Sequence, residues 1–422
     1  MSRRARPGGL ASGSAPRLWP KYMLSLIRST RRTAPTVLGL DLGQAAIRAV
    51  QLRRAPDSPS SAGGAGDTQP FAGPWMVIDA VQWDRRPDEP AELKTGWSER
   101  LRRGLRQRAF RGRRVAVGFS SPDVEIHALE LPDDAAAGQA PVVAAARIEI
   151  ERLMSFEDGS AETDFWRIPR GRGTRTDALG VAAPRARVLE IWDLCRRAGL
   201  DCRRIDASAC AVARLGTMLR FAGPRDIWGA LDLGYRAARL ALCVDDVPVL
   251  ARAFDTGGAK WTARIAEGLQ VSPASAELHK RDHGLALAGR GLRRRNRAAA
   301  ADDEVHAVPA ATAHVPNDEL AGMITSILRS ELDQLAAEIE RSYAYVQQCF
   351  PERGIGGLML VGGGALTRNL EHHLSQRLGI SVRAADGWSA GERSALRWSG
   401  TQRQPISTLG VAIGLALSEY PA

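Results

Sequence analysis

The stretch that decides the fold is residues 37–52, VLGLDLGQAAIRAVQL. It predicts an apolar strand over 37–40, a tight turn at Asp41-Leu42-Gly43 and a second strand over 47–52. A buried strand that ends in an acidic residue and then glycine suits a phosphate site. The carboxylate can hold water or Mg²⁺, and glycine lets backbone N–H groups approach a phosphate. Taken alone, such a turn is more often a plain hairpin.

The same pattern recurs in the second half of the chain. Residues 228–244, WGALDLGYRAARLALCV, repeat the strand, the turn at Asp232-Leu233-Gly234 and the following strand. A repeated supersecondary unit indicates that two halves of the molecule share one architecture. The repetition therefore favours a pair of phosphate-binding hairpins over two unrelated turns.

Composition sets the outer bounds. A chain of 422 residues predicts two or more domains, and 25% charged with 44% hydrophobic residues is typical of a globular protein. No apolar run approaches the roughly 18 residues that span a membrane, and the N-terminus does not read as a signal peptide. The five cysteines show no metal-ligand spacing, and an odd count argues against a disulfide framework. We therefore expect a reduced, cytosolic protein.

The net charge of +11 raises the question of a nucleic-acid or membrane-surface partner. The basic residues are nearly all arginine, spread along the chain, with Lys21, Lys94, Lys260 and Lys280 the lysines. A bias in residue usage accounts for this pattern, and no nucleic-acid motif accompanies it. We expect no nucleic-acid partner.

Three segments do not read as packed structure. Residues 1–35, rich in Arg, Pro, Gly and Ser, predict a disordered basic tail. Residues 54–74 predict a linker, and residues 284–316, rich in Ala and Arg, a disordered insert. Between them, helical periodicity predicts helices at 91–109, 140–154, 184–198, 208–219, 260–269, 272–283 and 317–350. In the helix at 140–154 we expect Val143, Ile148 and Met154 to be buried.

The C-terminal third holds a glycine run. A strand predicted at 356–361 leads into Gly362-Gly363-Gly364-Ala365, and a helix is predicted at 369–378. This order lets the backbone approach a flat ligand such as a nucleoside, although a glycine-rich turn is the alternative. Residues 407–417, STLGVAIGLAL, predict a helix of small residues that packs closely on a neighbour.

The ordered set of these parts resembles a known superfamily. The stretches that carry the likeness are VLGLDLG, AARIEIERLMSF, VAAPRARVLEIWDLCRRAGLDCRRID, SAELHKRDHG, EIERSYAYVQQ, LMLVGGGALTRNLEHHLSQRLGISV and STLGVAIGLAL. Together they resemble the actin/Hsp70/hexokinase superfamily and, within it, the bacterial actin-like PilM proteins of type IV pilus assembly. The likeness covers most of residues 23–417.

The resemblance implies an α/β, actin/Hsp70-like (RNase H-like) two-lobed nucleotide-binding fold with an inserted FtsA-type subdomain. The first lobe would span 36–227, with the inserted subdomain at about 80–199. The second lobe would span 228–405, and a C-terminal helix within 406–422 would pack on the first lobe.

It also implies ATP or ADP with Mg²⁺ between the lobes. Asp41 and Asp232 would hold the metal. The phosphates would meet Asp41, Gly43, Gln44, Asp232, Gly234 and Tyr235, and the nucleoside would meet Glu277, Lys280, Gly362, Gly363, Gly364 and Ala365.

The sequence departs from the family after each hairpin glycine. Gln44-Ala45-Ala46 and Tyr235-Arg236-Ala237-Ala238 stand where relatives carry hydroxyl residues. Those hydroxyls would hydrogen-bond phosphate or metal-bound water, so their loss predicts an ATP-binding protein with weak or no ATPase activity. Tyr235 and Arg236 are alternative donors, and we assign no catalytic residue.

The function implied by the resemblance is that of a cytoplasmic adaptor, peripheral at the inner membrane through protein partners. It would bind the N-terminal cytoplasmic tail of a PilN-like bitopic membrane protein. A pilus ATPase, other inner-membrane pilus components and self-association are further candidates. Two alternatives remain: an ATPase or sugar-kinase-like phosphotransferase, for which Asp206 is the nearest catalytic candidate, and an FtsA-like cell-division protein.

Overall fold

The computed structural model describes residues 35–55, 74–85, 96–119, 124–131, 139–157, 159–223, 225–287, 317–388, 396–399 and 404–419. The predicted tail at 1–35 and insert at 284–316 therefore lie almost wholly outside the described residues, as does most of the linker at 54–74.

The first sheet is built around β1, which carries Asp41. Strand β1 pairs antiparallel with β2 on one side and parallel with β4 on the other. The six strands lie in the order β14-β3-β2-β1-β4-β8. Their bounds are β1 Leu38–Leu42, β2 Ala46–Arg54, β3 Trp75–Asp84, β4 Arg114–Phe119, β8 Asp201–Ala207 and β14 Leu396–Trp398.

The second sheet repeats this arrangement around β9, which carries Asp232. Strand β9 pairs antiparallel with β10 and parallel with β12. The five strands lie in the order β11-β10-β9-β12-β13. Their bounds are β9 Ile227–Leu233, β10 Ala238–Val244, β11 Val247–Phe254, β12 Ile355–Val361 and β13 Val382–Ala384. The two Asp-x-Gly segments therefore share a strand topology as well as a sequence pattern.

A third, antiparallel sheet has the order β5-β7-β6 and packs against helix α3. The bounds are β5 Glu125–Leu129, α3 Gln139–Leu153, β6 Ala161–Arg167 and β7 Ala178–Pro184. Within the range 80–199 predicted for the inserted subdomain, β4 and the end of β3 pair with the first sheet, whereas β5, β6 and β7 form the separate sheet. Strand β14 also pairs with β3 of the first sheet, although its sequence position lies within the range predicted for the second lobe.

Helix α3 corrects one prediction. Val143 and Ile148 are 48% and 67% exposed, so they do not belong to its buried face. The buried residues are Val142, Ala146 and Ile150, which recur every four residues and turn toward β5 and β7. Met154 is half-buried.

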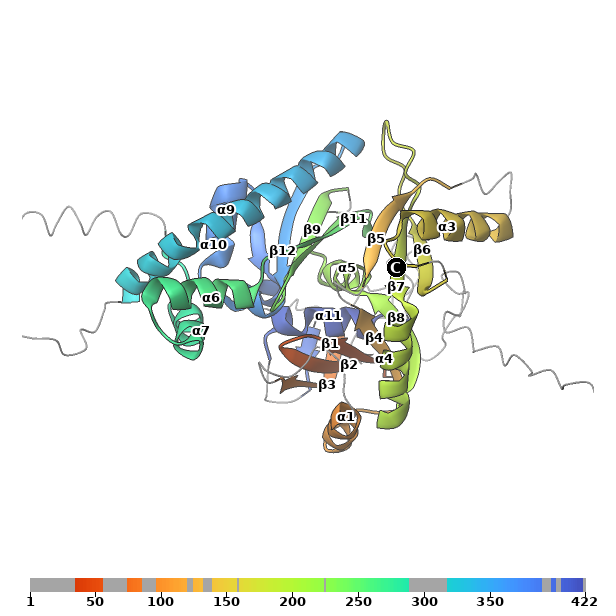
Figure 1. Ribbon diagram of the computed structural model, residues 1–422, viewed down its shortest axis with the longest axis horizontal. Helices are drawn as coiled ribbons and strands as arrows, with labels where there is room; N and C mark the ends of the chain where they lie inside the picture. Colours follow the sequence, from red (N-terminus) through yellow and green to blue (C-terminus); the bar gives the residue numbers. More distant parts are fainter. Residues whose placement is uncertain are drawn as a thin grey trace, which may run out of the picture.

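Helix α11 (Ile406–Ala416) lies against β1, β2, β4 and α5 (Ser208–Leu219), as Figure 1 shows. A Cβ atom on Gly39 would lie 1.9 Å from the carbonyl oxygen of Ala412, and one on Gly414 would lie 1.8 Å from that of Ala211. Because no side chain fits at either place, small residues are what allow α11 to approach both neighbours. The predicted close packing of this helix is confirmed.

The remaining helices flank the sheets. Helix α1 packs against α4, while α6 contacts both α7 and α9. In α9 the periodic residues Ile324, Leu328, Leu335 and Ile339 are buried, and Ile327 is half-buried. The bounds are α1 Gly96–Arg106, α4 Arg185–Ala198, α6 Gly258–Leu269, α7 Pro273–Asp282, α9 Asn317–Cys349 and α10 Leu370–Leu378.

Candidate functional site

The two aspartates of the repeated hairpins each face an arginine. Asp41 stands opposite Arg48 in the strand register, and Asp232 opposite Arg239. The Nη1–Oδ2 distances are 3.3 Å and 3.2 Å. Asp41 is 7% exposed and Asp232 8%. Each hairpin therefore holds a nearly buried ion pair, and the two pairs together carry no net charge.

The two hairpins influence each other electrostatically. Burial raises the pKa of Asp41 above its ordinary value of 3.8; the positive charge of Arg48 opposes this rise and the negative charge of Asp232 adds to it. Arg239 also lowers the pKa of Asp41. A charge from the second sheet thus acts on a carboxylate of the first sheet.

The glycine run packs directly on the second hairpin. Gly362 has φ 85°, and a Cβ there would lie 2.5 Å from Oδ1 of Asp232. A Cβ on Gly364 would lie 2.8 Å from that of Leu233, whereas around Gly363 there is open space within 4 Å. Ala365 is buried in the 3₁₀ turn η1 (Gly363–Leu366). Two glycines are needed for contact with the hairpin, and the third leaves room for a flat group.

The start of α6 packs on the other side of the same hairpin. The N–H of Gly258 donates to the carbonyl of Gly234 at 3.0 Å, and the N–H of Ala259 donates to that of Tyr235 at 2.7 Å. The side chain of Tyr235 is 40% exposed. The first two N–H groups of α6 therefore hold the start of this helix on the hairpin turn.

Lys280 ties α7 to this helix start. Its Nζ donates to Oε2 of Glu277 (2.6 Å), to Oγ1 of Thr262 (2.7 Å) and to the carbonyl of Gly258 (3.1 Å). Lys280 is 6% exposed, and burial lowers its pKa although Glu277 opposes that effect. Glu277 and Lys280 therefore form an ion pair that is anchored to the start of α6, next to the second hairpin.

The structure thus gathers most of the predicted residues around Asp232. Gly234, Tyr235, Lys280, Glu277 and the glycine run adjoin one hairpin, and Asp41 and Gly43 form the other. Gln44 lies half-buried in the first turn. The prediction omitted Arg48, Arg239, Gly257, Gly258 and Thr262. The arginines could have been found, because each stands seven residues after its aspartate.

Magnesium fits this donor set only together with a ligand. Within the described residues, no three or more His, Cys, Asp or Glu side chains form a group that could hold a metal. Two carboxylates are nevertheless a common contribution to Mg²⁺, which takes its remaining ligands from phosphate oxygens and water.

Asp206 is not placed as a catalytic base. Its carboxylate is paired with the guanidinium of Arg214, which also donates to the carbonyl of Gly414 at 3.1 Å. Arg204 lies 4.0 Å from the same carboxylate. Asp206 therefore joins β8, α5 and α11 in a structural network.

A pocket of about 140 Å³ opens beside the second hairpin. Its apolar walls come from β5, β11 and the start of α5, and Asp232 and Arg239 stand in its lining. Both β5 and β11 are edge strands of their sheets. Cavities of about this size can hold a benzene-sized group. The pocket thus joins two open sheet edges to the Asp232–Arg239 pair.

Neither a protein-family model nor a curated protein matches the chain. Among solved structures, the chain is similar to one of the PilM–PilN type IV pilus biogenesis complex, with a TM-score of 0.64 and 20% identity over 91% of this chain and 98% of that one. Ethanolamine utilization protein EutJ from Carboxydothermus hydrogenoformans follows at 14% identity, TM-score 0.47, covering 91% and 89%. The structure of MreB 5 of Spiroplasma citri bound to AMPPNP has 13% identity and a TM-score of 0.47, covering 92% of this chain and 96% of that one. The chain therefore has the actin-like α/β fold, and it shares that fold with the PilM–PilN complex structure over nearly its whole length.

Proposed function

We propose that this protein is an actin-like adaptor that binds ATP or ADP with Mg²⁺ between Asp41 and Asp232. The repeated Asp-x-Gly hairpins, the buried Lys280 beside the second one and the open space at Gly363 support this ligand class. Asp41 and Asp232 would hold the metal, which neutralises phosphate charge when bound. Arg48 and Arg239 are near enough to turn from their aspartates toward phosphate oxygens.

The proposed output is partner binding rather than chemistry. A phosphotransferase needs a base for the attacking hydroxyl, and Asp206 is held by Arg214. The hydroxyl residues that would orient water are replaced in both turns. These two features support weak or absent hydrolysis.

The partner we propose is the N-terminal cytoplasmic tail of a PilN-like bitopic membrane protein. The fold likeness to the PilM–PilN complex supports this class. Within the described residues no helix has the length and apolar character to cross a bilayer, and we propose that the partner holds the protein at the inner membrane. An extended tail could add to the open edge of β5 or β11 and place one apolar side chain in the 140 Å³ pocket.

The observation that carries this proposal is that the second hairpin and the pocket have two residues in common. Asp232 and Arg239 belong both to the nucleotide hairpin and to the pocket. If phosphate draws Arg239 away from Asp232, the pocket changes shape and charge. Nucleotide and tail would then change each other's affinity by the same factor.

The test is a binding titration of a labelled synthetic PilN-like tail with the full-length chain, with and without Mg-ATP. Ala251→Leu fills the pocket from β11 and should weaken tail binding at least about tenfold. Ala144→Leu makes the same change on the solvent face of α3 and should bind like wild type. Absence of tail binding in every nucleotide state, or equal loss in both variants, would contradict the proposal.

A further inference from the structure

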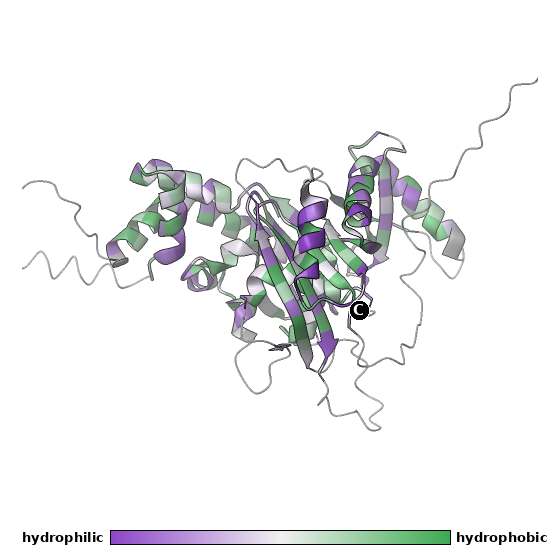
Figure 2. Ribbon diagram, turned by 90° about the horizontal axis from the view of Figure 1, so that it is seen from below, coloured by the Kyte–Doolittle hydropathy of each residue, from purple (hydrophilic) through white to green (hydrophobic). Residues whose placement is uncertain are grey.

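The end of the first sheet away from the second one carries a dense group of arginines. From α1 through the start of β4, the sequence contains one acidic residue, Glu99, and eight arginines. The arginines are Arg100, Arg102, Arg103, Arg106, Arg108, Arg111, Arg113 and Arg114. Helix α1 buries Trp97 and Leu101 and turns Arg102, Arg103 and Arg106 to solvent. Figure 2, seen from below, shows α1 in front and mostly hydrophilic.

Among the described arginines outside this group, more than half have an acidic partner, as in the pairs of Arg185 with Glu162 and of Arg353 with Asp245. In this group Arg108 is paired with Asp79, and Arg114 with Glu419 at 2.8 Å. Within the described part of the chain, the guanidinium groups of Arg102, Arg103, Arg106 and Arg111 form no salt bridge. Positive charge is therefore left uncompensated on this surface.

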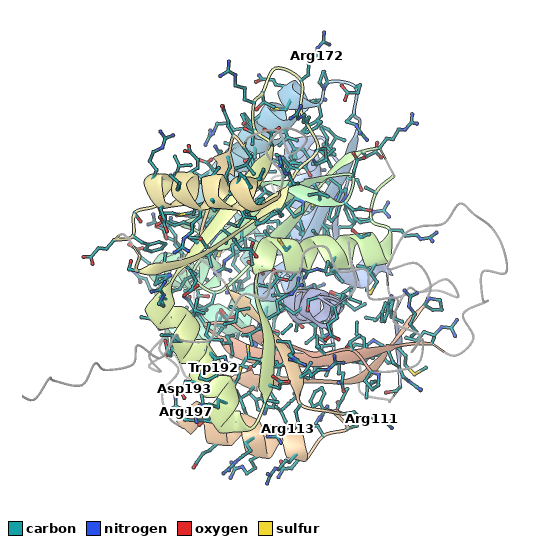
Figure 3. The ribbon with its side chains drawn as sticks, turned by 90° about the vertical axis from the view of Figure 1, so that its right-hand side faces the viewer. Arg111, Arg113, Arg172, Trp192, Asp193 and Arg197 are labelled. Atoms are coloured by element: carbon teal, nitrogen blue, oxygen red, sulfur yellow. The ribbon has the colours of Figure 1, made fainter. Side chains whose placement is uncertain are left out.

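The end of α4 extends the same surface. The Nε of Arg113 donates to the carbonyl of Gly199, where α4 ends, at 2.7 Å. In the last turn of α4 a single carboxylate, Asp193, serves both Arg196 and Arg197. Figure 3 shows Arg111, Arg113 and Arg197 at one end of the molecule and Arg172 at the other. We call Arg102, Arg103, Arg106, Arg111, Arg113 and Arg197 the arginine face.

The chain enters the fold beside this face. The side-chain amide of Gln51 donates to the carbonyls of Thr36 (2.9 Å) and Arg111 (2.7 Å), and its oxygen accepts from the N–H of Arg111 (2.7 Å). The sequence before Thr36 contains no Asp or Glu; its basic residues are Arg3, Arg4, Arg6, Arg17, Lys21, Arg28, Arg31 and Arg32. Positive charge in the sequence therefore continues from the face into the segment that precedes β1.

We propose that the arginine face contacts an anionic lipid bilayer directly, in addition to any hold through a membrane partner. A bilayer presents a broad plane of negative charge, and it attracts basic residues within about one Debye length without any shaped groove. Guanidinium groups spread over α1, the 107–113 segment and the end of α4 match such a plane.

Nucleic acid is a poorer match for the same charge. Reading a duplex needs a helix or ribbon that enters a groove, and binding a single strand needs exposed aromatic rings for stacking. The ring of Trp97 is buried, with the guanidinium of Arg100 4.5 Å from its centroid, and the half-buried ring of Trp192 has the guanidinium of Arg196 6.0 Å from its centroid.

Vesicle co-sedimentation with the full-length protein tests the proposal. Vesicles of phosphatidylglycerol with phosphatidylcholine should bind the protein, and vesicles of phosphatidylcholine alone should not. Binding should fall steeply as salt rises from about 0.05 to about 0.5 M. The variant Arg102→Glu/Arg103→Glu/Arg106→Glu should bind the anionic vesicles at least about tenfold more weakly.

The matched control is Arg172→Glu/Arg175→Glu/Arg329→Glu, three exposed arginines away from the face. Both triple variants lower the net charge by the same amount, so loss of binding in the first alone identifies the face. Equal loss in both, or wild-type binding in the first, overturns the proposal. Stronger retention on duplex DNA than on vesicles, lost in the first variant, would assign the face to nucleic acid instead. The nucleotide-dependent thermal shift should survive in both variants, which separates this result from the proposed function.

Discussion

Arg48 and Arg239 give the two hairpins a feature that sequence motifs alone did not reveal. Each arginine faces its aspartate across an antiparallel pair, so a neutral ion pair stands where phosphate and metal would lie. Each aspartate holds its arginine in place. Phosphate can then compete for the arginine while a metal competes for the carboxylate, which couples both exchanges to nucleotide binding.

Asp232→Asn should remove the nucleotide-dependent stabilisation. It keeps the shape of the side chain but takes away the charge that would hold Mg²⁺ and position Arg239. At a ligand concentration near 100 times Kd, wild type should gain about 2.7 kcal/mol from nucleotide, and the variant close to none. Asp245→Asn is the control, because Asp245 follows the end of β10, at the end of the β9–β10 pair away from Asp232, where it pairs with Arg353. Denaturation with and without Mg-ATP measures both, and an unaltered shift in Asp232→Asn would mean that Asp232 is only a turn residue.

Glu277 should make the stability depend on acid pH. Burial opposes ionisation of this side chain, but the hydrogen bonds from Lys280 and Thr262 outweigh it and hold the pKa of Glu277 below its ordinary value of 4.5. A lowered pKa contributes stability above 4.5 that is lost as pH falls through the folded value. Wild type should therefore exceed Glu277→Gln in stability at neutral pH, and the difference should shrink below about pH 4.5. Glu340→Gln, at an exposed pair with Arg377, is the control; a difference independent of pH would contradict this reading.

At the scale of elements, α11 is the helix that connects the two large sheets. It contacts β1, β2, β4, α5 and β12, so it touches both large sheets. Glycine at positions 39 and 414 sets its distance from β1 and α5. The same helix accepts the N–H of Gly362 at the carbonyl of Ser407, at 2.8 Å, which anchors the glycine run. The packing of α11 and the position of the glycine run therefore depend on each other.

Two glycine substitutions in helices should act with opposite sign. Gly414→Ala forces a Cβ against the backbone of α5 and should cost at least about 2 kcal/mol in the free energy of unfolding. Gly322→Ala in α9 meets no atom within 4 Å and should add about 0.5–1 kcal/mol, because alanine favours a helix. Urea denaturation measures both values. Equal effects of the two changes would show that α11 does not need this close approach.

Sequence reasoning reached the elements whose signals are local. The end of α4 at Gly199, the long α9 and the small-residue α11 follow from capping, periodicity and residue size. It failed where non-local pairing decides. The assignment of β4 and β14 to the first sheet depends on strand neighbours, and the buried face of α3 depends on where β5 and β7 lie. Ion pairs such as Asp232–Arg239 can be predicted only when the strand register is known, although the same seven-residue spacing in both hairpins is visible in the sequence.

At the scale of the whole molecule, two large sheets of matching topology lie on either side of α11, and a third small sheet adjoins the second hairpin. Figure 1 shows the third sheet, with α3, beside the edge strand β11. This placement sets the pocket against Asp232 and Arg239. One ion pair therefore borders both the proposed nucleotide site and the proposed partner pocket.

The central claim is that the paired hairpins form a nucleotide site that serves binding rather than turnover. The most direct measurement is calorimetric titration of the full-length chain with Mg-ATP, combined with phosphate release from the same sample at saturation. We predict saturable binding with turnover far below the order of 10 s⁻¹ that is common for enzymes. Turnover near that rate would contradict the adaptor function and favour a phosphotransferase, and absence of binding by both ATP and ADP would refute the nucleotide site itself.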